Sequence, residues 1–299
     1  MTSIRRRTFC LGSATAAALY PLTLKAQSQA PRVVASFSIL ADMARELAPA
    51  GVQVSALVGP DSDAHVYEPS PADARRLAQA DLVLINGLGF EGWIERMVNV
   101  SGYRGRVAVA SQGIQPRSIG DHDTDPHAWQ DLALGRRYAA NIGAAFAELW
   151  PHRRDEIVRR SADYTARIDQ LDAKVRAWLG AVPRAQRRVI TSHDAFGYFG
   201  AAYGVDFLAP QGWTTNSEPS AAAVARLIRQ IRQEGIRAVF IENISDPRLV
   251  ERLAQEGGVH VGGTLYSDAL SRPGGPADSY LKLFHHNASS IARALSAQT

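Results

Sequence analysis

The stretch PHRRDEIVRRSADYTARIDQLDAKVRAWL, residues 151–179, decides how the chain is organised. It contains no glycine, and its only proline, Pro151, suits the first turn of a helix. Apolar side chains recur at steps of three and four residues, the spacing of one helix face: Ile157, Tyr164, Ile168, Leu171, Val175 and Trp178. A helix over these residues would be about 43 Å long. It would be either an amphipathic surface helix or a rigid strut that joins two lobes.

Strand-like and helix-like segments alternate on both sides of this stretch, which is typical of mostly parallel sheets covered by helices. Apolar strands are expected at 32–37, 52–58, 81–86 and 106–110, and again at 187–192, 205–210, 237–243 and 259–266. Helices are expected between them, including one over 90–98 and one whose N-cap is Ser217. The fold class is therefore α/β, with two lobes, each a mainly parallel sheet flanked by helices, and with the long helical segment between them. The expected boundaries are 31–148 for the first lobe, 149–182 for the linker helix and 183–299 for the second lobe.

The charge of the chain gives no support for nucleic-acid binding. The 299 residues include 33 Lys and Arg against 29 Asp and Glu. Four of these bases and none of the acids lie in residues 1–26, so removal of that segment would leave 29 of each. A neutral balance therefore gives no argument for binding to phosphate backbones. The hydrophobic fraction of 46% is enough for a substantial core.

Residues 1–26 have the pattern of an export signal. Arg5, Arg6 and Arg7 precede a short apolar run over 9–22, and small residues with a candidate cleavage position near Ala26 follow. The RRTF sequence at 6–9 favours the twin-arginine route, with an ordinary secretory signal as the alternative. The only cysteine, Cys10, lies within this signal, so the mature chain would contain no disulfide, no thiolate zinc site and no cysteine nucleophile.

Candidate ligand residues follow predicted strands, where open α/β sheets bind their ligands. His65 and His127 belong to the first half of the chain, and His193 and Asp268 belong to the second half. Imidazole nitrogen and carboxylate oxygen are both ligands of Zn²⁺, and the same set would also accept Mn²⁺. Each residue also has an ordinary structural interpretation, as a loop or capping histidine, a buried histidine bonded to backbone, or a helix N-cap. Location alone leaves these alternatives open.

Four motifs make the sequence resemble the zinc/manganese solute-binding proteins of ABC importers. They are DAHVYEPSP at 63–71, DPHAW at 125–129, SHDAFGYF at 192–199 and TLYSDAL at 264–270, with NSEPS at 216–220 and FIEN at 240–243 in the expected order. The resemblance runs from about residue 32 to the C-terminus. It implies two α/β lobes bridged by one long helix, and it implies His65, His127, His193 and Asp268 as the metal ligands. Asp194 and Glu218 are candidates for hydrogen bonds that support the site.

The resemblance implies a periplasmic protein without enzymatic activity that binds Zn²⁺ with high affinity and delivers it to a membrane permease. Mn²⁺ is the alternative cargo, a periplasmic metallochaperone would be a further partner, and the protein is expected to be a monomer. Three imidazoles favour zinc over a more oxygen-seeking metal. The segment GDHDTD at 120–125 occupies the place of a longer histidine- and acid-rich loop in many zinc members. It is interpreted as a solvated loop tip or as an auxiliary capture site made by Asp121, His122 and Asp123.

Two other functions compete with metal capture. A zinc hydrolase would need an open coordination position and a nearby base such as Glu218, Glu242 or Asp194, and the sequence contains no HExxH, GxSxG or P-loop motif. A binding protein for a metal chelate or haem would share the long-helix architecture. Such a protein would present arginine or aromatic side chains to an organic ligand, instead of four converging metal ligands.

Overall fold

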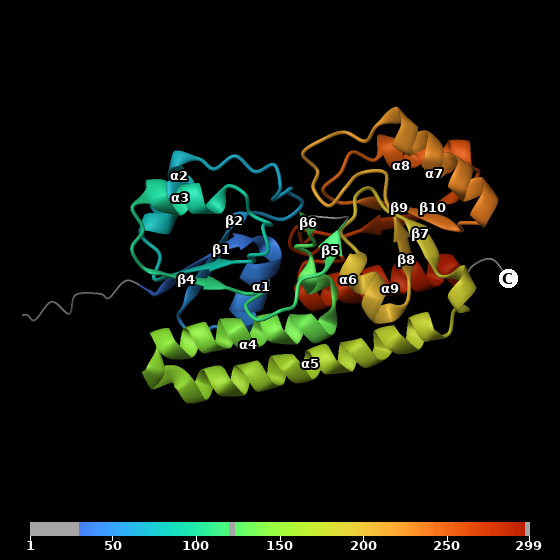
Figure 1. The fold of residues 1–299 in the computed structure, drawn as a ribbon. Coiled ribbons are helices and arrows are strands. Elements are labelled where there is room, and N and C mark those ends of the chain that lie inside the picture. The colour runs from blue at the N-terminus through green and yellow to red at the C-terminus, as the bar shows by residue number, and fades with distance from the viewer. Residues whose placement is uncertain (1–29, 120–122, 297–299) are drawn as a thin grey trace, which may run out of the picture.

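A computed structural model describes residues 30–119 and 123–296 of the chain, and it contains two lobes that lie side by side above a pair of long helices (Figure 1). The first sheet has the strand order β2-β1-β3-β4, and all its neighbouring strands are parallel. The second sheet has the order β10-β9-β7-β8, also parallel throughout. The predicted fold class is confirmed.

In the first lobe, helices connect the parallel strands. The elements are β1 (Arg32–Phe37), α1 (Ser38–Leu47), β2 (Gln53–Val58), α2 (Pro71–Ala78), β3 (Leu82–Ile85), α3 (Ile94–Ser101) and β4 (Arg106–Val109). A short antiparallel pair, β5 (Ser118–Ile119) and β6 (Asp123–Thr124), and the 3₁₀ turn η1 (Ala128–Gln130) lead into α4 (Leu132–Leu149). Five of the six β1 residues are buried, as expected for a strand covered on both faces.

The second lobe repeats the alternation after the 3₁₀ turn η3 (Arg184–Gln186). Its elements are β7 (Arg188–Ile190), α6 (Gly197–Tyr203), β8 (Asp206–Leu208), α7 (Ala221–Glu234), β9 (Ala238–Glu242), α8 (Arg248–Gly257), β10 (His260–Leu265) and α9 (Tyr280–Ser296). A hydrophobic cluster between β9, α7 and α8 forms its outer core. The larger cluster is continuous from the first sheet through α4 and α5 to α6 and α9, so the two lobes share much of their core.

The long helix is α5 (Arg154–Gly180), which follows a single 3₁₀ turn, η2 (Pro151–Arg153). Its 27 residues span about 40 Å. Five of the six residues that predicted it are buried, and Trp178 lies at the edge against His285. The helix contacts α1 and α4 of the first lobe and α6 and α9 of the second lobe, so it joins the two lobes (Figure 1). Its outer face remains exposed.

Two predicted helix starts are wrong. Helix α3 begins at Ile94 and not at residue 90, because Gly87, Leu88 and Gly89 adopt positive φ and form a turn before it. Helix α7 begins after Ser220, whose hydroxyl accepts a hydrogen bond from the Ala223 amide at 3.1 Å. Pro219 disfavours helical geometry in the residue before it, which excludes a start at Ser217. Among the described helices, none is both long and apolar enough to span a bilayer.

Candidate metal centre

Four side chains from four separate loops converge between the two lobes. His65 follows β2, His127 precedes α4, His193 follows β7, and Asp268 follows β10. One ligand atom from each of these residues lies within 4.8 Å of the others. The structure therefore brings together all four residues that the sequence singled out, two from each half of the chain, at the carboxyl-terminal edges of the sheets.

The spacing of these atoms fits a small cation. The Nε2 atoms of His65 and His193 each lie 3.2 Å from Oδ2 of Asp268, and Nε2 of His127 lies 3.7 Å from Oδ1. A tetrahedral zinc site with bonds of 2.0–2.2 Å has edges of about 3.3–3.6 Å. The three Nε2 atoms and both Asp268 oxygens are buried and have no hydrogen-bond partner. Buried polar atoms without partners are rare, and a shared cation would satisfy all of them.

Asp125 holds His127 in place. Its Oδ1 accepts a hydrogen bond from the His127 amide at 3.0 Å and lies 2.9 Å from the ring Nδ1. The Asp125 amide is fixed in turn by the Arg117 carbonyl, next to β5. The carboxylate directs Nε2 into the centre and makes the ring a stronger donor to metal. The sequence places Asp125 next to the candidate ligand His127, but the contact with the ring becomes visible only in the structure.

Glu242, at the end of β9, supports His193. Its Oε1 accepts from the His193 amide at 2.9 Å, and its Oε2 lies 2.7 Å from the ring Nδ1. Burial by itself lowers the pKa of the His193 imidazole, but the carboxylates of Glu242 and Asp268 raise that pKa well above its usual value. Sequence reasoning named Asp194 and Glu218 for supporting roles and considered Glu242 only as a hydrolytic base. The FIEN motif was the available signal, but the role depends on β9 lying beside β7.

Asp268 is a buried carboxylate stabilised by its neighbours. Burial by itself raises its pKa, but the His127 and His193 rings hold the pKa of this carboxyl well below its usual range. The preceding carbonyl, of Ser267, accepts hydrogen bonds from Trp129 Nε1 at 2.9 Å and Gln130 Nε2 at 2.7 Å. The turn that follows His127 therefore anchors the loop that carries Asp268.

His65 lies in a loop that is fixed at both ends. Its amide donates to Asp63 at 2.8 Å, and the loop ends at a capping box between Ser70 and Asp73. Its ring lies edge-on to Phe90, with centroids 4.8 Å apart, and to Trp213, at 6.0 Å. These apolar rings limit the access of water to the centre.

Of the proposed auxiliary residues, the structure describes only Asp123, which does not join this group. Asp123 lies in β6, where its side chain is exposed, and it is not part of the four-residue cluster. Asp121 and His122 lie outside the described residues, as does the export segment 1–26. The capture role of this loop stays a prediction.

Comparisons with known proteins agree on one class. The family described as "Zinc-uptake complex component A periplasmic" matches residues 33–294. Manganese-binding lipoprotein MntA of Bacillus subtilis is 32% identical over 280 residues, covering 91% of this chain and 92% of that protein. Zinc-binding protein TroA of Treponema pallidum is 35% identical over 274 residues, covering 89% of each. The solved structure of periplasmic TroA superposes with a TM-score of 0.85 at 33% identity, covering 89% of this chain and 99% of TroA.

Proposed function

Because the chain belongs to the family of zinc-uptake complex component A, the metal-binding component of an ABC importer, we propose that its cargo is Zn²⁺. It binds the ion with high affinity at His65, His127, His193 and Asp268, in the periplasm, and delivers it to a membrane permease. Export by the twin-arginine route and exchange with a periplasmic metallochaperone belong to the same proposal.

The observation that carries the proposal is the convergence of three imidazole nitrogens and one carboxylate that have no other partners. Four ligands complete a tetrahedron around zinc and leave no position for a reactive water. His127, His193 and Asp268 are fully buried, which leaves no space for a haem or an organic chelate at this centre. The geometry thus favours capture of a bare ion over hydrolysis or chelate binding.

Manganese is the second candidate cargo, and one feature of the centre favours it. Asp268 directs Oδ2 toward His65 and His193 and Oδ1 toward His127, so both oxygens face the place of the ion. A carboxylate that binds through both oxygens raises the coordination number and the share of oxygen ligands, which suits Mn²⁺. MntA, which is similar to this chain, carries manganese in its name.

The test is a titration of demetallated mature protein with Zn²⁺ against a competing chromogenic chelator at neutral pH, followed by Mn²⁺ under the same conditions. A single tight zinc site that Mn²⁺ fails to displace supports the proposal. Sites of this kind ordinarily bind Zn²⁺ more tightly than Mn²⁺, so an affinity for Mn²⁺ equal to or higher than that for Zn²⁺ would assign manganese as the cargo instead. The absence of tight binding of either ion would refute metal capture at this centre.

A further inference from the structure

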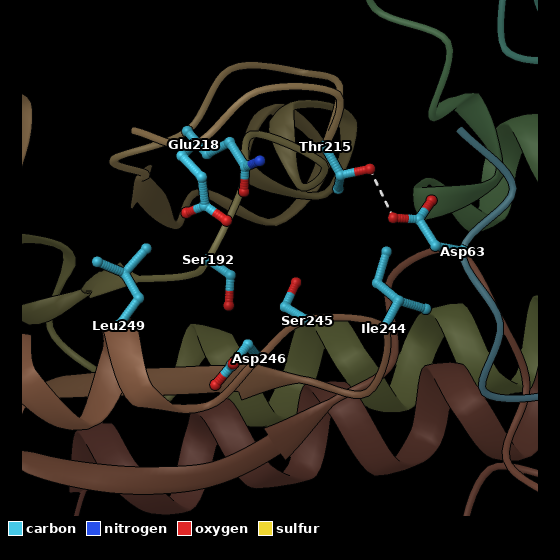
Figure 2. Close-up of a pocket in the computed structure, with 9 residues that line it drawn as sticks. Asp63, Ser192, Thr215, Glu218, Ile244, Ser245, Asp246 and Leu249 are labelled. Carbon is cyan, nitrogen blue, oxygen red and sulfur yellow. Dashed lines mark hydrogen bonds between the residues drawn. The ribbon is translucent and has the colours of Figure 1, made fainter. Parts of the chain in front are cut away.

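A second polar cavity lies beside the metal centre. This cavity of about 170 Å³, here called the outer pocket, is lined by Asp63, Ser192, Thr215, Glu218, Ser245 and Asp246, among others (Figure 2). Ser192 immediately precedes the proposed ligand His193. Asp63 is not one of the four proposed ligands, but its carboxylate accepts a hydrogen bond from the amide of the proposed ligand His65. The outer pocket therefore shares its walls with two of the four ligand loops.

The oxygen atoms of the outer pocket suit a cation that keeps its water. Asp63, Glu218 and Asp246 contribute three carboxylates, of which Asp246 is paired with Arg248. Glu218 is exposed and makes no hydrogen bond or ion pair with any residue in the described part of the chain, although its charge contributes to the raised pKa of Arg248. Figure 2 shows its carboxylate directed toward Ser192. A cavity of this size holds several waters. Hydrated divalent cations prefer such oxygen ligands.

The hydroxyl of Ser192 points to a ligand in this cavity. The residue is 2% exposed, its Oγ has no hydrogen-bond partner, and Figure 2 shows the hydroxyl directed into the pocket between Ser245 and Asp246. Oγ of Ser245 is also buried without a partner. Buried hydroxyls are normally satisfied by protein or by ordered water, so two unpaired ones facing the same space indicate bound water or a hydrated ion there.

The loop of residues 209–220 lines the outer pocket and also contacts two residues of the centre. Gln211 pairs with the backbone of His193, and Trp213 packs against the ring of His65. The loop is fastened to the first lobe by the hydroxyl of Thr215, which donates to Oδ2 of Asp63 at 2.5 Å. A displacement of this loop would therefore uncover His65 toward the outer pocket.

From these contacts we propose that the outer pocket is a waypoint that holds the incoming or departing cation, still hydrated, before it exchanges water for the four ligands. The inference rests on the proposed function and deepens it. Glu218 supplies the unpaired charge, Ser192 binds the water shell, and loop 209–220 separates the two positions. The recognised chemistry is that of a hydrated divalent cation.

The kinetic test uses Glu218→Gln, with Glu251→Gln as the matched control. Glu251 lies exposed on α8 outside the outer pocket, so both variants remove one charge from the same lobe. Stopped-flow tryptophan fluorescence follows zinc binding and release, because Trp129 and Trp213 lie against ligand rings. Glu218→Gln is expected to slow both association and dissociation about three- to tenfold at low ionic strength, with much less effect at about 0.5 M salt.

The outcomes separate this inference from the function it rests on. Slower exchange in Glu218→Gln alone, with the equilibrium dissociation constant nearly unchanged, supports the waypoint. Wild-type rates in Glu218→Gln, or equal slowing in Glu251→Gln, overturn it while leaving zinc capture intact. If wild-type protein binds no zinc, the proposed function itself fails.

A second measurement asks for the held ion directly. Zinc-loaded protein is titrated with Mn²⁺, and free Mn²⁺ is followed by its electron paramagnetic resonance signal. One additional, weakly bound ion per chain is expected, and it should be lost in Glu218→Gln and retained in Glu251→Gln. The absence of such an ion in the wild type, or its persistence in Glu218→Gln, contradicts the assignment of the outer pocket.

Discussion

Replacing Glu242 by glutamine tests whether a carboxylate outside the ligand set tunes the metal centre. The substitution keeps an oxygen that can accept from the His193 amide, now 2.9 Å from Oε1. It removes the negative charge that lies 2.7 Å from the ring Nδ1. The imidazole then becomes a weaker donor and its ring loses part of its orientation.

The expected loss is about 10- to 100-fold in zinc affinity, as for partners of metal-binding histidines in general. This corresponds to about 1.4 to 2.8 kcal/mol of binding free energy. Both contacts of Glu242 are fully buried, which places the effect toward the upper part of that range because solvent does not screen them.

The assay is the chelator competition at neutral pH, applied to wild type, Glu242→Gln and the control Glu251→Gln. Thermal unfolding of each metal-free protein shows whether the fold is retained. The metal-induced rise in Tm gives an independent measure of affinity, because binding to the native state alone adds stability by mass action. Zinc affinity in Glu242→Gln within about twofold of wild type would refute the idea that second-layer carboxylates tune this centre.

Three further outcomes are expected. His127→Ala removes a proposed ligand, so it should lower zinc affinity by more than Glu242→Gln does, which means by more than about 100-fold. A smaller loss of affinity in the same titration would show that His127 is not a ligand. Acidification from about pH 7.5 to about 5.5 should weaken zinc binding because protons compete for the imidazoles, and an affinity independent of pH would contradict the three-histidine assignment. Burial raises the pKa of Asp42 to about 6, against the opposing hydrogen bond from the Tyr280 amide. The stability that protonation of Asp42 contributes is therefore fully present below about pH 4 and is lost as pH rises through about 6. Asp42→Asn should raise the free energy of unfolding of the metal-free protein at about pH 8 by at most about 3 kcal/mol. Urea titrations should show that this difference between variant and wild type disappears at about pH 4.

The parts of the fold that sequence could predict are those set by local pattern. Strand–helix alternation gave both parallel sheets, and the spacing of apolar residues over 157–175 gave the long helix. Helix starts were predicted less well, because Ser217 and Ser220 are equally good caps and only Pro219 decides between them. The division of the chain at 148 and 182 stays a prediction.

The four candidate ligand residues could be predicted from the sequence because each follows a strand or precedes a helix within a recognisable motif. Their supporting contacts were not accessible to the same degree. Glu242 reaches His193 across 49 residues, and Trp129 reaches the Ser267 carbonyl across 138. Such pairs depend on the order of strands in a sheet and on how the lobes pack, neither of which local periodicity specifies.

The way the Asp268 loop is held bears on how the ion is released. Its flanks bind the first lobe through Leu270, whose amide donates to Ser38 at 3.0 Å and whose carbonyl accepts from Asp61 at 2.9 Å. The candidate ligand Asp268 belongs to the second half of the chain by sequence, but the residues on both sides of it bind the first half. Helix α5 packs against both lobes, and one hydrophobic core is continuous between them. A wide separation of the two lobes would therefore break these hydrogen bonds and also expose part of that core. The loops that carry His65 and residues 209–220 are joined mainly by the Thr215–Asp63 bond near the centre, so their separation breaks far fewer contacts. We therefore expect release of the ion through local loop movement on that side.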